Sequence, residues 1–154
     1  MTLRGAAGDF PIGVALTERW FSDSAYTRTA VLNFNSLVAE NECKWQVIQS
    51  QAGKFDFGPC DRMLDFAEAN GMEFRFHTLA WFNYAPSWLY QLDTVEREAA
   101  LRNHVETVVG RYCGRVSSWD VVNEALNEDG SFRTGHVWAD FDYVDVAFRT
   151  GSSL

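Results

Sequence analysis

Apolar residues alternate along the chain between short continuous runs and longer segments with helical spacing. The short runs lie at residues 11–16, 36–41, 72–80 and 115–126, and each predicts a buried β-strand. Helical spacing follows each run, at residues 22–34, 60–71, 93–114 and 141–150. Strands that alternate with helices indicate a parallel sheet with right-handed crossovers. The sequence therefore predicts an α/β fold made of four strand–helix units.

Several residues mark the ends of the predicted helices. Ser22 or Ser24 is suited to cap the first helix, because a hydroxyl can accept from the unpaired N–H groups of the first turn. Gly71 is a natural stop for the second helix. Asp93 and Glu96 have capping-box spacing at the start of the third. Loops are expected at 52–59, 83–88 and 127–135, and no linker or repeat divides the chain, so it is one domain or part of one.

Composition and charge exclude several classes of protein. The 154 residues are 47% hydrophobic and 22% charged, which is enough apolar content for a folded core. The net charge of −8, with only 13 Lys and Arg, argues against binding to nucleic acid or to an anionic membrane. No run approaches the roughly 20 apolar residues of a membrane span. Residues 1–10 lack a secretion signal, so we expect either a cytosolic chain or a mature or truncated form of a secreted one.

Cysteine and histidine positions show no pattern typical of metal ligands. Cys43, Cys60 and Cys113 are widely spaced and odd in number, and they form no disulfide framework. We therefore expect three buried free thiols. The three histidines, His77, His104 and His136, are equally scattered, and we expect neither a metal nor a cofactor.

Polar and aromatic side chains follow three of the four predicted strands. They are Glu40, Asn41, Lys44 and Trp45 after the second strand, His77 and Trp81 at the third, and Asn123 and Glu124 at the fourth. The carboxyl ends of parallel strands meet at one edge of the sheet, where α/β proteins place their chemistry. The sequence therefore predicts a site at this edge.

Each of these residues also has a purely structural interpretation. Glu40 and Lys44 are four residues apart and could pair on a helix surface. His77 could be a hydrogen-bonded core histidine, and Asn123 could cap a following helix. Their shared place at one edge of the sheet favours a functional site over three separate structural roles.

The residue types point to carbohydrate chemistry. Aromatic residues make up 15% of the chain and include six Trp, whose flat faces pack on apolar ligand faces such as those of sugar rings. A carboxyl group among aromatic side chains can stay protonated near neutral pH and act as a general acid. No Gly-x-Ser-x-Gly motif is present, so nucleophilic serine catalysis fits less well.

Three motifs resemble, in order and spacing, the hallmark segments of glycoside hydrolase family 10. They are VAENECKW at 38–45, HTLAW followed by APSWL at 77–89, and SSWDVVNEAL at 117–126. The resemblance extends from Leu3 to about Arg149. It implies a (β/α)₈ TIM barrel and the hydrolysis of β-1,4 links in xylan with retention of configuration. An extracellular location is also implied by the resemblance alone.

The resemblance assigns a role to each candidate residue. Glu124 would be the general acid/base, and Asn123 would contact the sugar beside the scissile bond and help to orient the nucleophile. His77 and Trp81 would line the same subsite. The next sugar would be bound by Glu40, Asn41 and Lys44. Trp45 would pack behind them.

Two departures from the family pattern change what we expect. Where the family has His, a polar residue and Gln after HTLxW, this chain has Phe82, Asn83 and Tyr84, so the sugar that is recognised could differ. The length matches only the first four strand–helix units, a half barrel, because a whole barrel takes about 250 residues. The family's nucleophile comes from the seventh strand, so we expect it to be absent and the chain alone to be inactive.

Two alternatives to a hydrolase remain open. The chain could bind xylo-oligosaccharides without cleaving them, or it could be inert. A half barrel would also leave strand edges uncovered, and we expect self-association through them.

Overall fold

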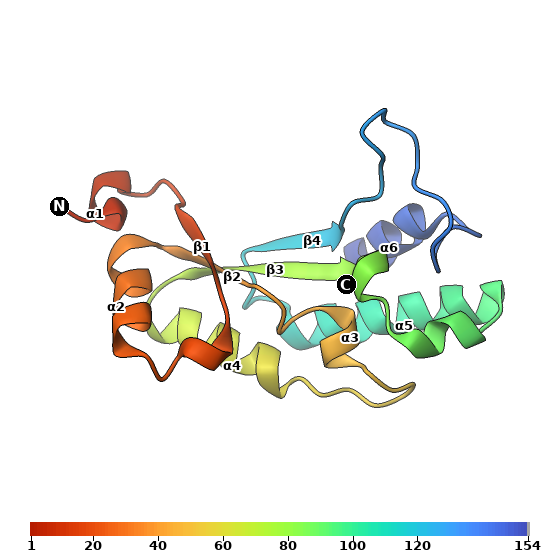
Figure 1. Cartoon of the computed structure of the whole chain (residues 1–154), viewed down its shortest axis with the longest axis horizontal. Helices are drawn as coiled ribbons and strands as arrows, with labels where there is room; N and C mark the ends of the chain where they lie inside the picture. Colours follow the sequence, from red (N-terminus) through yellow and green to blue (C-terminus); the bar gives the residue numbers. More distant parts are fainter. Residues whose placement is uncertain (154) are drawn as a thin grey trace.

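The computed structural model describes residues 1–153 and contains one parallel β-sheet (Figure 1). Its strands are β1 (Gly13–Leu16), β2 (Ser36–Ala39), β3 (Glu73–Ala80) and β4 (Ser118–Val122), in the order β1-β2-β3-β4. Every neighbouring pair is parallel. Consecutive strands are therefore neighbours in space, which is the arrangement of half a β/α barrel. The predicted fold class is confirmed.

Four longer helices connect or follow the strands where the sequence predicted them. They are α2 (Ser24–Asn33), α4 (Gly58–Ala69), α5 (Thr94–Tyr112) and α6 (Tyr143–Ser152). The short elements were not predicted, because three to five residues carry no helical period. These are α1 (Leu3–Ala7), α3 (Trp45–Ile48) and the 3₁₀ turns η1 (Glu18–Trp20), η2 (Phe82–Tyr84) and η3 (Ser87–Gln91).

The helix caps confirm one prediction and correct another. At the start of α5, the Asp93 side chain accepts from the Glu96 N–H while the Glu96 side chain accepts from the Asp93 N–H. The predicted capping box is therefore present. The cap of α2 is Asp23, so the prediction of Ser22 or Ser24 is wrong. A carboxylate oxygen of Asp23 accepts from two backbone N–H groups at once.

Several segment boundaries also differ from the prediction, as β1 begins at Gly13 and β2 ends at Ala39. The last strand is limited to Ser118–Val122 within the predicted range 115–126. The predicted loop at 52–59 ends early, because Gly58 and Pro59 already belong to α4. Proline is accommodated in the first turn of a helix, where its missing N–H would have no intrahelical partner.

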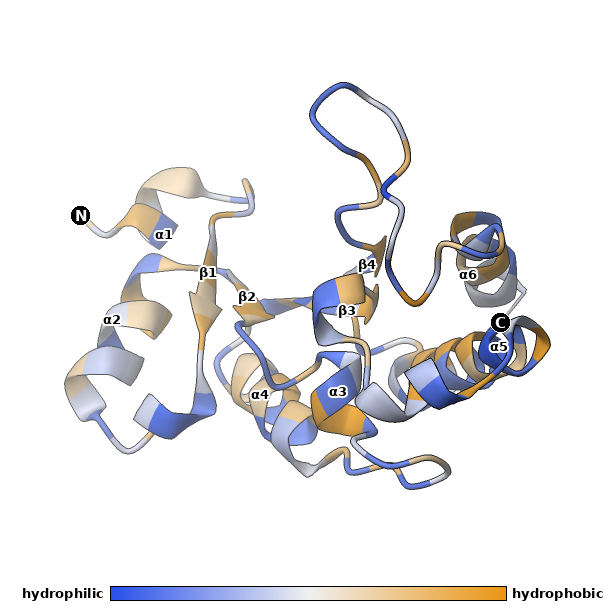
Figure 2. Ribbon diagram, turned by 45° about the vertical axis from the view of Figure 1, so that its right-hand side comes forward, coloured by the Kyte–Doolittle hydropathy of each residue, from blue (hydrophilic) through white to orange (hydrophobic). Residues whose placement is uncertain are grey.

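The two faces of the sheet differ in chemistry. Along β3, Phe74 and Phe76 are buried whereas Arg75 is exposed and His77 is half-buried, as expected when successive side chains point to opposite faces. Phe76 packs against Tyr112 of α5, with 5.7 Å between the ring centroids, and α4 and α5 lie on the same side of the sheet (Figure 2). Arg75 and His77 lie on the other face, which would be the interior of a closed barrel.

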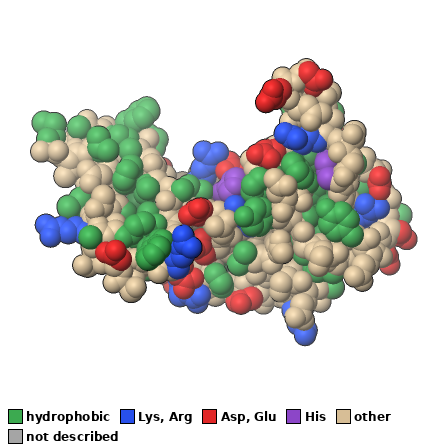
Figure 3. All heavy atoms as spheres, viewed as in Figure 1, with side chains coloured by type: hydrophobic (Ala, Val, Ile, Leu, Met, Phe, Trp, Pro, Cys, Tyr) green, Lys and Arg blue, Asp and Glu red, His purple; other side chains and the backbone are tan. Residues whose placement is uncertain are grey.

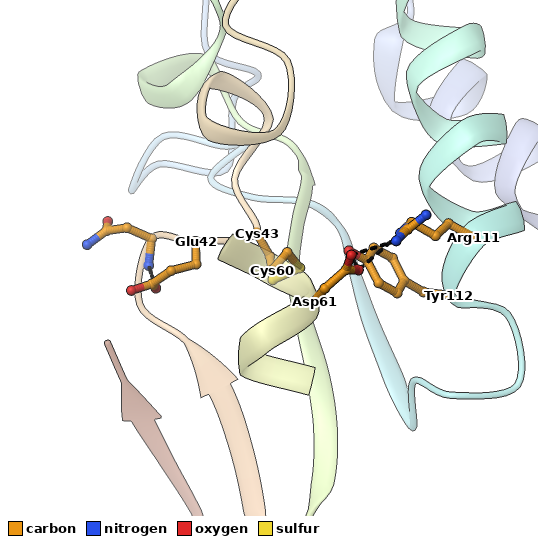
Figure 4. The surroundings of a disulfide bond; sticks show 7 residues. Glu42, Cys43, Cys60, Asp61, Arg111 and Tyr112 are labelled. Atoms are coloured by element: carbon orange, nitrogen blue, oxygen red, sulfur yellow. Dashed lines mark hydrogen bonds and ion pairs between the residues drawn. A yellow bond between two sulfur atoms is a disulfide. The ribbon is translucent and has the colours of Figure 1, made fainter. Parts of the chain in front are cut away.

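Cys43 and Cys60 form a disulfide bond, so the prediction of three free thiols is wrong (Figure 4). Their Cα atoms are 4.8 Å apart although 17 positions separate them in the chain. Cys43 follows β2 and Cys60 lies in the first turn of α4, and packing of α4 against β2 brings them together. Cys113 is free but exposed. Sequence spacing alone could not reveal this pairing, because it depends on how the chain crosses over.

The core lies between the sheet and the helices. The largest fully buried side chains include Phe74, Phe76, Tyr112 and Trp138. Trp45 is buried as well, and it stacks on Trp138 at a centroid distance of 5.1 Å. None of the helices within residues 1–153 combines the length and apolar character that crossing a bilayer requires.

Candidate active site

The segments that follow β2, β3 and β4 meet at one edge of the sheet, as the sequence predicted. Glu40 directly after β2, His77 in β3 and Asn123 directly after β4 line a single pocket of about 340 Å³. The surface is hollowed between the part that holds α1 and α2 and the loop at 123–142, and charged side chains gather in the hollow (Figure 3). The predicted site residues are therefore brought together at this edge.

Trp81 and Glu124 are joined directly across this edge. The indole Nε1 of Trp81 donates a hydrogen bond of 2.9 Å to Oε2 of Glu124. The backbone of Glu124 has a φ of 54°, in the left-handed region that few residues other than glycine adopt. Unusual backbone geometry of this kind concentrates at functional sites. Within residues 1–153 no salt bridge involves Glu124, so its carboxylate is not neutralised by a neighbouring cation.

A second group, here called the Lys44 cluster, consists of Asn41, Lys44, Trp81 and Tyr84. Nζ of Lys44 donates to Oδ1 of Asn41 at 2.9 Å, and the Tyr84 hydroxyl donates to the same oxygen at 3.2 Å. The Lys44 ammonium lies 4.0 Å from the ring centroid of Tyr84 and 4.9 Å from that of Trp81. The two rings stack at 5.1 Å. The cluster therefore combines an amide, a cation and an aromatic wall.

Glu42 anchors this cluster to the first strand. Its carboxylate accepts from Oγ1 of Thr17 at 2.7 Å, from the Glu18 N–H at 2.8 Å and from the Asn41 N–H at 3.0 Å. Burial favours the protonated form, but these hydrogen bonds outweigh it and hold the pKa of Glu42 below its usual value. Burial also lowers the pKa of the Lys44 ammonium, although the negative charges of Glu40 and Glu42 act to raise it.

Arg75 and Asp120 form an ion pair on the interior face of the sheet, and Asp120 also contacts the site residue His77. Arg75 contacts both carboxylate oxygens of Asp120, with Nη2 at 2.6 Å from Oδ1 and Nε at 2.9 Å from Oδ2. The Asp120 carboxylate also contacts His77, whose Nδ1 lies 3.0 Å from Oδ2. The His77 ring lies 5.9 Å from the ring of Trp81. Asp120 thus orients His77 within the site.

Four residues of this arrangement were not predicted as parts of the site, namely Glu42, Arg75, Asp120 and Tyr84. Arg75 and His77 are two positions apart on β3, so they share a face. Asp120 is the single charged residue within the apolar strand β4. A charged residue among the apolar residues of a half-buried strand is expected to have a partner, and this signal could have identified the pair.

The structural alternatives for four site residues are wrong. Lys44 is buried and Glu40 is exposed, so they do not form a pair on a helix surface. No helix follows Asn123 directly, and α6 is capped by Asp142. His77 is only half-buried, and it lines the pocket.

The predicted packing role of Trp45 is confirmed. Its ring stacks on His104 at 3.9 Å, and its Nε1 donates to Oε1 of Gln49 at 2.9 Å. His104 is fully buried, and burial lowers its pKa to about 3 against a smaller opposing effect of the Leu79 backbone. Among the described residues, no group of three or more His, Cys, Asp or Glu could hold a metal ion.

Comparison with known proteins identifies relatives of the whole chain. The model of glycosyl hydrolase family 10 matches residues 3–153. Beta-1,4-xylanase of Dictyoglomus thermophilum is 44% identical over 90% of this chain, and endo-1,4-beta-xylanase B of Neocallimastix patriciarum is 38% identical over 99%. The crystal structure of xylanase 10B from Thermotoga petrophila RKU-1 in complex with xylobiose is 34% identical and covers 99% of this chain, with a TM-score of 0.91.

These relatives are longer than this chain. The chain spans 40% of the Dictyoglomus protein, 18% of the Neocallimastix protein and 50% of the Thermotoga structure. The match nevertheless extends over almost all of the described sheet and helices. The chain belongs to glycosyl hydrolase family 10.

Proposed function

We propose that this chain forms the half of a retaining xylanase site that holds the general acid/base. Glu124 is the acid/base, and the residues at the edge of the sheet bind the sugars on the non-reducing side of the scissile bond. The observation that carries the proposal is the hydrogen bond from Trp81 to Glu124. It holds the carboxyl group beside an aromatic face, where a sugar ring can pack.

In this proposal Glu124 transfers a proton in both steps of the reaction. It first donates a proton to the leaving glycosidic oxygen while a second carboxylate attacks the anomeric carbon. Glu124 then takes a proton from water, and the water oxygen displaces the enzyme carboxylate from the sugar. The second carboxylate must lie roughly 5–5.5 Å from the first. We propose that it belongs to barrel strands other than the four described here.

The remaining residues bind substrate. His77, Trp81 and Asn123 surround the sugar next to the scissile bond, and Glu40, Asn41 and Lys44 bind the sugar beyond it. The related Thermotoga structure contains xylobiose, which supports a β-1,4-linked xylose polymer as the substrate. We propose that residues 1–154 are part of a family 10 catalytic domain and that it acts outside the cell.

A second candidate function is binding of xylo-oligosaccharides without cleavage. This chain covers half of the Thermotoga structure, and it has the proposed sugar-binding residues without an assigned nucleophile. Both points favour binding without cleavage for the chain alone. In that case Trp81→Ala, which removes apolar contact, should weaken binding more than Glu124→Ala.

The test has a binding arm and a hydrolysis arm. NMR titration of the 154-residue chain with xylotriose should shift the resonances of Trp81 and Lys44 but not those of Trp20, which lies outside the site. A folded chain that binds no xylotriose would overturn the proposal for both candidate functions. Release of sugar from xylan by the chain, absent from Glu124→Ala, would instead mean that a second carboxylate is already supplied.

The acid/base role is tested in a complete barrel. In a hybrid enzyme, residues 1–153 replace the corresponding half of the Thermotoga xylanase, whose backbone they match closely. Glu124→Ala should lower the hydrolysis of xylan by about 10²–10⁴-fold. The matched control is Glu106→Ala, an exposed carboxylate on α5. Equal rates for Glu124→Ala and the unsubstituted hybrid would remove Glu124 from the mechanism.

A further inference from the structure

We propose that Tyr84 is a positioning residue that fixes the Asn41 amide and the Lys44 ammonium for sugar recognition. This inference rests on the proposed function and deepens it. The hydroxyl of Tyr84 contacts Asn41, and its ring contacts Lys44.

The hydroxyl of Tyr84 completes the hydrogen bonding of the Asn41 oxygen. Oδ1 of Asn41 accepts from both Lys44 and Tyr84, and an amide oxygen has two lone pairs. Because an ammonium group only donates, the amide atom that faces Lys44 must be the oxygen. The orientation of the amide is therefore determined, and its NH₂ group has no protein partner among the described residues. Both of its hydrogens remain available for sugar oxygens.

The ring of Tyr84 holds the Lys44 ammonium. Nζ lies 4.0 Å from the ring centroid of Tyr84 and 4.9 Å from that of Trp81, within the range of cation–π attraction. Lys44 is buried, and its long stem would otherwise have several rotamers to choose from. Two ring faces and the Asn41 oxygen leave it one position, from which the ammonium can donate to a sugar hydroxyl.

Tyr84 also links two separate segments. It lies in η2 after β3, whereas Asn41 and Lys44 follow β2, 43 positions earlier in the case of Asn41. Stacking on Trp81 at 5.1 Å fixes the Tyr84 ring relative to the residue that contacts Glu124. Tyr84 therefore sets the spacing between the amide and ammonium donors and the acid/base end of the site.

Two variants separate the hydroxyl from the ring. Tyr84→Phe keeps the ring and removes the hydroxyl, and Tyr84→Leu removes both. Tyr90→Phe is the matched control, because Tyr90 is exposed and lies outside the cluster. Thermal unfolding of each variant tests whether the chain remains folded.

The first readout is NMR of the chain without ligand. Tyr84→Phe should shift the side-chain NH₂ resonances of Asn41 and leave the ring-shifted methylene signals of Lys44 in place. Tyr84→Leu should shift both sets. Tyr90→Phe should shift neither. Unchanged Asn41 and Lys44 signals in both Tyr84 variants would overturn the inference.

The second readout is the dissociation constant for xylotriose. We expect Tyr84→Phe to weaken binding on the order of threefold to tenfold, as for loss of one hydrogen bond, and Tyr84→Leu to weaken it further. Unchanged binding in both variants would overturn the role in recognition. If the unsubstituted chain binds no xylotriose but shows the predicted NMR shifts, the proposed function fails while the positioning contacts stand.

Discussion

Trp81 and Glu124 lie 43 positions apart in the sequence, yet Nε1 of one donates to Oε2 of the other at 2.9 Å. This bond connects the loop after β3 with the end of β4. Its acceptor is a side-chain carboxyl oxygen and its donor lies on a separate segment, so the bond fixes the indole and the carboxyl group relative to each other. The indole therefore does more than offer an apolar face, because it also holds the carboxylate in place.

Trp81→Phe separates these two contributions. The variant keeps an aromatic face but loses the donor, so xylotriose binding to the chain should change little. In the hybrid barrel kcat should fall about tenfold or more. Trp88→Phe is the control, since Nε1 of Trp88 donates to the backbone oxygen of Gln49, away from Glu124. A kcat that stays constant in Trp81→Phe would mean that Glu124 is positioned without this bond.

Reduction of the disulfide should destabilise the chain and loosen the Lys44 cluster. Cys43 immediately precedes Lys44, and a cross-link that closes a loop of this length stabilises by about 3 kcal/mol. Urea unfolding with and without dithiothreitol measures the difference. Cys43→Ala/Cys60→Ala should be as unstable as the reduced chain and insensitive to reductant.

Cys113→Ser is the matched control for the disulfide, because Cys113 is exposed and unpaired. Its unfolding midpoint should equal that of the unsubstituted chain and should fall by the same amount on reduction. If reductant lowers the unfolding midpoint of the double-alanine variant as much as that of the unsubstituted chain, the effect does not arise from the Cys43–Cys60 bond.

The order of elements and the edge of the sheet where the candidate site residues meet could be predicted from the sequence for definite reasons. The strands are continuous apolar runs because both faces of a parallel sheet are normally covered. The polar residues that end these runs were visible as breaks in that pattern, as with Asn123 and Glu124. Capping of α5 was predictable because Asp93 and Glu96 interact locally.

The rest depends on contacts between distant parts of the chain. The Cys43–Cys60 bond, the Arg75–Asp120 pair and the contact of Tyr84 with Asn41 each join residues on different elements. Sequence reasoning treats such residues one at a time. The cap of α2 was mispredicted for a more local reason, since three adjacent residues, Ser22 to Ser24, can all cap a helix.

Acid should destabilise the chain through His104. Burial lowers the pKa of His104 to about 3, whereas an unfolded histidine titrates near 6.5. Below pH 6.5 the unfolded state therefore binds a proton that the folded state does not, and stability falls as the pH drops towards 3. The expected slope is about 1.4 kcal/mol per pH unit.

His104→Leu removes this titration while keeping an apolar side chain beside Trp45. Urea unfolding between pH 6.5 and 4.5 should show a smaller loss of stability in the variant than in the unsubstituted chain. Burial also lowers the pKa of His136, so the variant should retain part of the acid sensitivity. His136→Leu is the comparison variant. The reductions in acid sensitivity caused by His104→Leu and His136→Leu should add in the double variant. Parallel pH profiles for His104→Leu and the unsubstituted chain would contradict the assignment.

The outer strands should cause the chain to self-associate. Within residues 1–153, β1 pairs only with β2 and β4 only with β3, so one edge of each outer strand has unpaired backbone groups, which favour pairing with another chain. Beside β4, an apolar pocket of about 220 Å³ is lined by residues that include Trp119, Val121 and Phe148. Phe148 is 53% exposed.

Charged substitutions at this surface provide the test. Size-exclusion chromatography with light scattering should show a mass that rises with concentration. Val121→Lys/Phe148→Glu should lower that mass, because a charge would have to lose its hydration in the interface. Phe132→Glu, which alters an exposed aromatic residue in the loop at 123–142, should not. A monomer at every concentration that unfolds in one sharp transition would show that four strands are stable without covering these edges.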